Sequence, residues 1–151
     1  MLKNILISSL CFLFISIANA KQIKITSDQL EIIRTENISI FTGKVYALGD
    51  NLEIWSEKLI VTSSEDEKEV KEINAYGNVK ILREGLSING NEAKYRPIKN
   101  KLVVFGEVEV IQNKNIILCD KIVVDLENSS SIMSSDNISR VEALIISENE
   151  N

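Results

Sequence analysis

One short pattern occurs three times in this chain of 151 residues, as Phe41-Thr42-Gly43-Lys44-Val45, Ala75-Tyr76-Gly77-Asn78-Val79 and Gly106-Glu107-Val108. The three glycines lie 34 and then 29 residues apart, and apolar residues recur at the same four offsets after each glycine. An acidic or amide residue also recurs fourteen positions after each glycine, as Glu57, Asn91 and Asp120. Such a period is typical of stacked copies of one supersecondary unit.

Within each copy the apolar residues alternate with polar ones, as in Val79-Lys80-Ile81 and Val108-Glu109-Val110. A period of two predicts β-strands, and the abundance of Ile and Val favours strands over long helices. Turn residues separate the predicted strands at Gly49-Asp50-Asn51, Gly85, Asn89-Gly90, Asn113-Lys114-Asn115 and Glu127-Asn128-Ser129, and the charged run 65–71 is interpreted as a solvated hairpin tip. The repeated glycines indicate bulges or close strand crossings.

The sequence therefore predicts an all-β domain whose antiparallel units each bury one apolar face, as a sandwich, a jelly roll or a solenoid. The lining of such an interior would be aliphatic, because aromatic residues make up only 5% of the chain. An aliphatic interior suits flexible acyl chains better than sugars, whose sites use aromatic platforms. A core that is simply filled by its own side chains is the alternative interpretation.

Residues 1–20 have a different composition from the rest: Lys3, an apolar run from Ile5 to Ile17, and Ala18-Asn19-Ala20. This arrangement predicts a cleavable signal peptide, and the apolar run is short for a hydrocarbon core of about 30 Å. An uncleaved anchor is the alternative. We expect an exported protein with a β-domain over 21–146 and a short polar tail over 147–151.

The composition argues against an enzyme. The chain has no His, which excludes Ser-His-Asp and Cys-His nucleophile pairs and His-ligated zinc. The net charge of −5 argues against nucleic acid as a partner. We expect no metal site and no cofactor. Cys119, which lies in an apolar run, is predicted to be a buried core residue.

The repeated carboxylates allow one enzymatic hypothesis, an exported polysaccharide-modifying enzyme that uses Asp28, Glu57 or Asp120 as an acid-base pair. Because an acidic or amide residue recurs at the same turn in every copy, we expect it to have the same local role in each, which is to accept hydrogen bonds from backbone N–H groups.

The order and spacing of three stretches, Phe41–Val45, Ala75–Val79 and Gly90-Asn91-Glu92-Ala93-Lys94-Tyr95, resemble the LptA/OstA family of periplasmic lipopolysaccharide-transport proteins. The opening Ile23-Lys24-Ile25-Thr26-Ser27-Asp28, the signal peptide and the closing strand from Arg140-Val141 to Ile146 are also similar to that family. The resemblance implies a twisted β-jelly roll, open at its ends, that bridges an inner-membrane complex and an outer-membrane translocon while lipopolysaccharide slides along its interior.

The resemblance also implies contacts. Ile23 and Ile25 match positions that contact lipid and that form the edge facing an LptC-like inner-membrane partner. The C-terminal strand would face an LptD-like outer-membrane partner. Head-to-tail self-assembly would use the same two edges. Ile81 and Tyr95 match positions on the lipid path. The alternation extends this predicted lining to Val45, Ile54, Leu59, Val79, Ile88, Phe105, Val108, Ile117 and Ile122. Two alternatives stay open: a membrane-anchored LptC-like component of the same bridge, and a structural envelope β-protein with a filled core.

Overall fold

The strands pair in one open antiparallel sheet. A computed structural model describes residues 22–136 and 139–147, so the predicted signal peptide lies outside the described residues. The strands and two short 3-10 helices are β1 (Lys24–Thr26), β2 (Gln29–Ile33), η1 (Arg34–Glu36), β3 (Ile38–Gly49), β4 (Leu52–Ser63), β5 (Val70–Arg83), β6 (Leu86–Arg96), η2 (Pro97–Lys99), β7 (Lys101–Gln112), β8 (Asn115–Asp125), β9 (Ser130–Ser134) and β10 (Glu142–Leu144). None of the helices in these ranges is long and apolar enough to cross a membrane.

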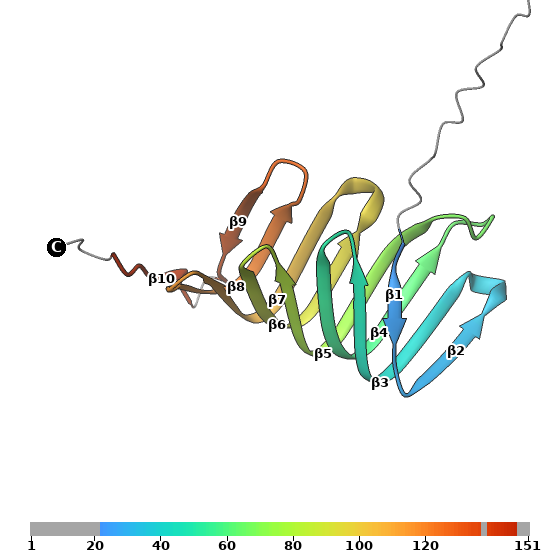
Figure 1. Cartoon of the computed structure of the whole chain (residues 1–151). Helices are drawn as coiled ribbons and strands as arrows, with labels where there is room; N and C mark the ends of the chain where they lie inside the picture. The colour runs from blue at the N-terminus through green and yellow to red at the C-terminus, as the bar shows by residue number, and fades with distance from the viewer. Residues whose placement is uncertain (1–21, 137–138, 148–151) are drawn as a thin grey trace, which may run out of the picture.

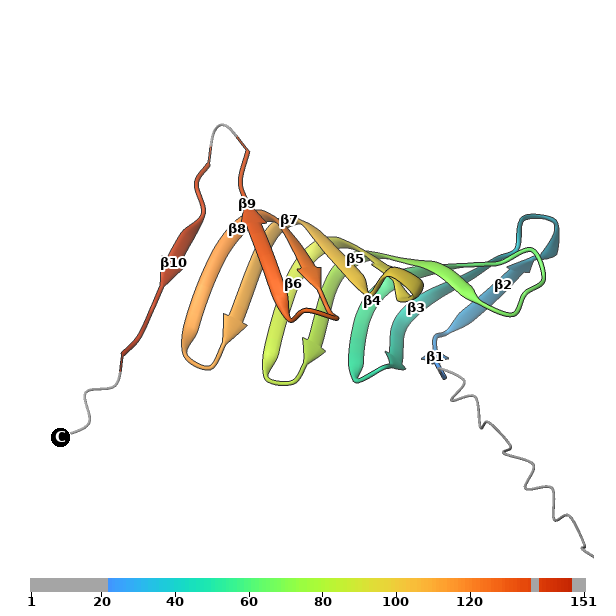
Figure 2. The same cartoon turned by 90° about the horizontal axis from the view of Figure 1, so that it is seen from above.

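The six long strands, β3 to β8, pair in chain order, and each bends near its middle so that it contributes to two layers (Figures 1 and 2). The short strands define the layers, because β1 pairs with residues 46–48 of β3 while β2 pairs with residues 38–42 of the same strand. At the other end, β10 pairs with residues 116–118 of β8, and β9 pairs with residues 121–125. We name the two halves the β1 layer and the β2 layer. The sheet does not close, which confirms the predicted all-β open fold.

The bends coincide with the repeated glycines. The register of the sheet shifts between Thr42 and Val45, between Tyr76 and Val79, and between Phe105 and Val108, which brackets all three glycines. Gly43, Gly77 and Gly106 have φ angles of 83°, 82° and 77°, which L side chains rarely adopt. The bulge interpretation of the glycines is therefore confirmed, and it explains how one strand can serve two layers.

The strands run farther than the sequence indicates. Asn89-Gly90 is not a turn, because β6 continues through it and only shifts its register between Asn89 and Glu92. The other predicted breaks are turns between strands. The prediction of a break at Asn89-Gly90 is wrong, because a Gly within a strand can mark a bulge as well as a turn.

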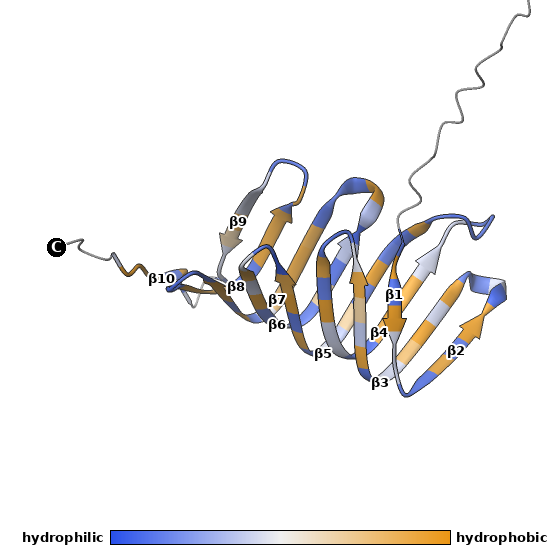
Figure 3. Cartoon of the chain, in the orientation of Figure 1, coloured by the Kyte–Doolittle hydropathy of each residue, from blue (hydrophilic) through white to orange (hydrophobic). Residues whose placement is uncertain are grey.

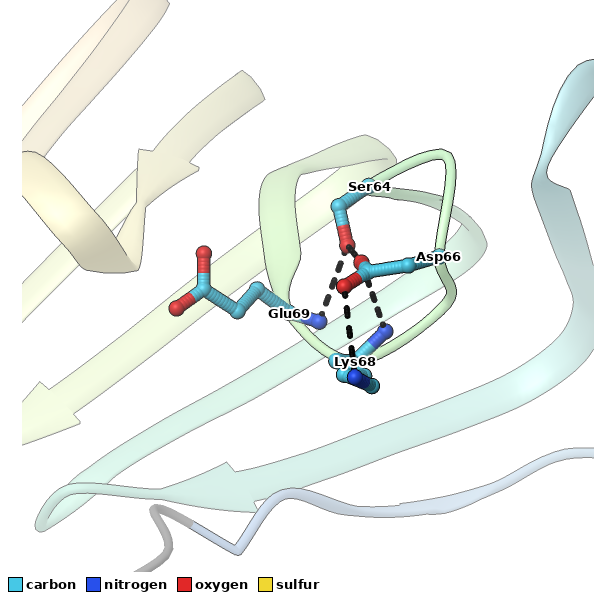
Figure 4. A network of polar contacts seen from close by, with 4 residues as sticks. All are labelled: Ser64, Asp66, Lys68 and Glu69. Atoms are coloured by element: carbon cyan, nitrogen blue, oxygen red, sulfur yellow. Dashed lines mark hydrogen bonds and ion pairs between the residues drawn. The ribbon is translucent and has the colours of Figure 1, made fainter.

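The charged segment between β4 and β5 is a hairpin tip, as predicted (Figure 4). The Ser64 hydroxyl donates to the Asp66 carboxylate at 2.5 Å and accepts the backbone N–H of Glu69 at 3.1 Å. The hydrogen bonds from Ser64 and from the backbone N–H of Lys68 lower the pKa of Asp66. These local bonds organise an exposed turn.

Candidate functional site

A continuous row of apolar side chains crosses the inner face of the β1 layer from one sheet edge to the other. Each member lies directly opposite the next in the strand register, and the row is Ile25, Ala47, Ile54, Ile81, Ile88, Val110, Ile117 and Ala143. We call it the long row. Its central members are 1–3% exposed, whereas Ile25 and Ile117 are partly buried and Ala143 is exposed. In Figure 3 the strands alternate between apolar and polar colours while most turns are hydrophilic.

A second row crosses the inner face of the β2 layer: Leu30, Phe41, Leu59, Ala75, Ala93, Val104, Ile122 and Met133. Leu59, Val104 and Ile122 are fully buried. Leu30, at the β2 edge, is 50% exposed. The interior is therefore filled in its middle and open to solvent at its N-terminal end.

Twelve of the thirteen predicted lining residues lie in or against this core. Ten are 0–3% exposed or partly buried inside the layers, and Ile23 and Ile25 pack against the core from the N-terminal edge. The twelve are Ile23, Ile25, Val45, Ile54, Leu59, Val79, Ile81, Ile88, Tyr95, Val108, Ile117 and Ile122. Their contact with lipid stays a prediction, while their placement on the inner face follows from the alternation.

Phe105 does not line the interior. It follows buried Val104 in the strand and pairs with exposed Glu92 and Lys121, so its side chain belongs to the outer face. The Lys121 ammonium lies 5.6 Å from the centroid of its ring. Alternation counted back from Val108 selects Val104, and not Phe105, for the inner face.

A hollow of about 320 Å³ opens between the layers near the C-terminal end. Its apolar lining comes from both layers and includes Leu86, Ile117, Val124, Met133 and Ile145. Polar residues at its rim come from the turns and strand ends: Arg83, Glu84, Gln112, Asn115, Ser129, Ser130 and Ser131. Pockets for small ligands typically have volumes of about 300–1,000 Å³, so this hollow can take an alkyl chain but not a whole large amphiphile.

Two polar contacts join the layers along the margin opposite the bends. The Arg83 Nη1 donates to the backbone oxygen of Leu126 at 3.3 Å, and the Tyr95 hydroxyl donates to the Asp50 carboxylate at 3.4 Å. Burial, with the negative charge of Asp50 as the next cause, raises the pKa of Tyr95 to about 12. Arg83 was not among the predicted site residues. Its position is nevertheless detectable in the sequence, because Arg83 continues the alternation of Val79 and Ile81.

Both ends of both layers carry a strand that pairs on one side only. Among the described residues these are β1 and β2 at one end and β9 and β10 at the other. The N-terminal end also exposes Ile32 at 58%, and the C-terminal end exposes Leu144 at 57% and Ile145 at 74%. Unpaired backbone groups next to exposed apolar side chains are the features of a surface onto which another strand can add.

The repeated carboxylates and amides do not form an acid-base pair. Asp28, Glu57 and Asn91 each lie over a different glycine, Gly43, Gly77 and Gly106 respectively. Asp120, at the end of the series, accepts the backbone N–H of Asp136 at 2.8 Å and the Ser139 hydroxyl at 2.5 Å. These hydrogen bonds lower the pKa of Asp120. The predicted local role at a backbone bend is therefore correct for Asp120, and the others pack against their glycines.

Cys119 and the acidic side chains complete the description of the described residues. Cys119 is buried, as predicted, and burial raises the pKa of its thiol. Within residues 22–136 and 139–147, no three His, Cys, Asp or Glu side chains gather where they could hold a metal ion.

Residues 24–130 match the family model described as LptA/(LptD N-terminal domain) LPS transport protein. The structure is similar to the crystal structure of LptH, described as the LptA-homologous periplasmic component of the conserved lipopolysaccharide transport device from Pseudomonas aeruginosa. The TM-score is 0.75 at 16% sequence identity, and the match covers 84% of this chain and 96% of that chain. No curated protein matches the chain in sequence.

Proposed function

Because the chain belongs to the LptA/(LptD N-terminal domain) family of lipopolysaccharide-transport proteins, we propose that it carries lipopolysaccharide across the periplasm with the lipid A acyl chains between its two layers. The long row supports this proposal, because it joins one sheet edge to the other without a polar interruption. The membership also agrees with the prediction of a carrier that is not an enzyme. Sliding along an apolar surface requires no catalytic residue.

The acyl chains would contact the predicted lining residues. Ile81 and Ile88 are each 1% exposed, so a chain reaches them only when the layers part. Parting exposes apolar surface at a cost of about 25 cal/mol per Å², and an acyl chain that fills the space offsets this cost by covering the same surface. The hollow beside Ile117 is the place where a chain fits without such parting.

The sheet edges would provide the contacts with neighbouring proteins. An LptC-like protein at the inner membrane would add its strand at β1 and β2, and an LptD-like protein at the outer membrane would add its strand at β9 and β10. Either addition continues the backbone pairing and the apolar interior together. Head-to-tail assembly of this chain would use the same two surfaces.

The proposed location requires export by the signal peptide predicted over residues 1–20. A membrane-anchored LptC-like protein would instead keep this segment. The mass of the N-terminal peptide of the protein isolated from cells distinguishes the two, since cleavage after Ala20 leaves Lys21 as the first residue.

Co-purification tests the carrier function. The full-length gene is expressed in a Gram-negative host, the exported protein is isolated in a mild neutral detergent, and lipopolysaccharide is detected by blotting. We expect lipopolysaccharide to elute with the protein and to be lost after denaturation. A folded protein that carries none would contradict the proposal and favour a structural envelope protein with a filled core.

A further inference from the structure

One charged side chain breaks the apolar character of the inner face, at the margin of the hollow. Arg83 continues the alternation of Val79 and Ile81, so its side chain leaves the β1 layer on the inner side, and it lines the hollow together with Leu86 and Val124. A cation next to an apolar surface is costly unless a hydrogen-bonding or charged partner compensates it.

The guanidinium is only partly satisfied by the described residues. Its Nη1 donates to the Leu126 backbone oxygen at 3.3 Å, which is long for an N–H···O hydrogen bond. Its Nε is buried and has no hydrogen-bond partner in the described part of the chain. A guanidinium offers five N–H donors in a planar fork that matches phosphate and carboxylate oxygens.

The rim around Arg83 can accommodate an anion. Ser129, Ser130 and Ser131 bring hydroxyl donors to the rim, and Gln112 and Asn115 bring amides. Glu84 is the one carboxylate among the residues that line this hollow, and it lies exposed in the turn between β5 and β6. Two more carboxylates, Asp50 and Glu127, line an adjoining hollow that Arg83 also borders. The floor below this polar rim is apolar.

We propose that the hollow binds a phosphate-bearing amphiphile, with its alkyl chain against Leu86, Val124 and Met133 and its phosphate on the Arg83 guanidinium. The apolar floor, the unpartnered Nε and the hydroxyl-rich rim each match one part of such a ligand. This inference deepens the proposed function, because it gives the C-terminal end of the lipid path a preference for an anionic head.

Calorimetric titration of the signal-free chain tests the inference with three probes: dodecyl phosphate and dodecyl maltoside, both below their micellar concentrations, and inorganic phosphate. The two amphiphiles share an alkyl chain and differ in the charge of the head. We expect dodecyl phosphate to bind at least about tenfold more tightly than dodecyl maltoside, because hydrogen bonds to charged groups contribute that much. Inorganic phosphate should bind far more weakly than dodecyl phosphate, since it lacks the chain.

Substitution then assigns the preference to one residue. Arg83→Gln should remove the tenfold preference, and Arg83→Lys should retain part of it. Arg34→Gln, which makes the same change of charge at an exposed residue of η1, should leave the preference intact. A role of Arg83 in holding the layers together would change the binding of both amphiphiles alike and leave their ratio unchanged.

The wild-type ratio keeps the test decisive even if an Arg83 variant fails to fold. Equal binding of the two amphiphiles by the wild-type chain, or a ratio unchanged in folded Arg83→Gln, would overturn the phosphate site while leaving the carrier function in place. Tight binding of inorganic phosphate alone would also overturn it, since that result points to an anion site without a lipid. Failure of the carrier function is detected separately, by the absence of co-purified lipopolysaccharide.

Discussion

The Glu57 carboxylate lies directly over Gly77, so that a Cβ placed on this glycine would come within 2.5 Å of Glu57 Oε2. The Asn78 side-chain amide, which follows the glycine, donates to the other carboxylate oxygen of Glu57 at 2.5 Å. The same relation joins Asp28 to Gly43 and Asn91 to Gly106. Each of the three copies of the sequence pattern thus contains a glycine at the bend that forms the two layers, covered by a side chain from a neighbouring segment.

Gly77→Ala should destabilise the fold by about 1–3 kcal/mol, because it combines an unfavourable φ of +82° with a steric clash. Gly85→Ala is the matched control, since Gly85 has a φ of +81° but no atom within 4 Å of its would-be Cβ. Urea denaturation gives the free energy of unfolding for both variants. An equal decrease in the free energy of unfolding for the two variants would mean that the close contact between Gly77 and Glu57 adds nothing to the cost of the substitution.

Leu59→Ala should lower the free energy of unfolding by about 2–5 kcal/mol, because Leu59 is fully buried in the second row and its removal leaves a cavity. Ile98, which is 63% exposed in η2, provides the control. Ile98→Ala should change stability by less than about 0.5 kcal/mol. Chemical denaturation that gives similar losses for the two variants would argue against the packed interior.

Glu72 should titrate far below an ordinary glutamate. A hydrogen bond from Asn74, followed by interactions with Arg96 and Lys94, lowers its pKa from 4.5 to about 2. Because the folded-state pKa is depressed, the stabilising contribution is present above about pH 4.5 and is lost as the pH falls through about 2. The carboxyl carbon shift of Glu72, followed by NMR against pH, measures this directly, and a midpoint near 4.5 would refute the geometry of this cluster.

Tyr95 should remain neutral at pH values where an ordinary tyrosine ionises. Its pKa is raised from 10 to about 12, first by burial and then by Asp50. The folded state therefore holds the proton more tightly, and this stabilising effect is present below pH 10 and is lost as the pH rises through about 12. The difference in tyrosinate absorbance between wild type and Tyr95→Phe should appear only near the upper value or on unfolding. A difference already complete near pH 10 would contradict the burial of Tyr95.

The sequence predicts much of this fold because alternation is a strong signal wherever one face of a strand is buried. Val79 and Ile81 lie on one inner face, as their spacing indicates. The alternation reverses at the bulge in β6 and β8. In β6, Ile88 and Ala93 are both buried although their positions differ by five, and in β8 the same holds for Cys119 and Ile122, whose positions differ by three. A reading of local pattern cannot foresee such a reversal without the register of the neighbouring strand.

The candidate site is less accessible to sequence reasoning than the fold. The predicted lining included Phe105, although the alternation within β7 places Leu102 and Val104 inside. Arg83 continues the alternation of Val79 and Ile81, but its place beside the hollow depends on Val124 and Leu126, which come from a distant part of the chain. The pairing of Asp120 with Ser139 depends on a chain reversal that no short pattern encodes.

The central claim, that lipid runs between the two layers, is tested most directly by photo-crosslinking along one strand. A photoreactive residue is placed singly at Val79, Lys80, Ile81 and Leu82 of β5 in the living envelope, with Lys68 at the exposed hairpin tip as the control, and lipopolysaccharide is detected by blotting after irradiation. We predict crosslinks from the buried positions Val79 and Ile81 and none from Lys80, Leu82 or Lys68. A folded protein that gives no crosslinked lipopolysaccharide from Val79 or Ile81, or equal crosslinking yields from all four positions of β5, would contradict a lipid path between the two layers.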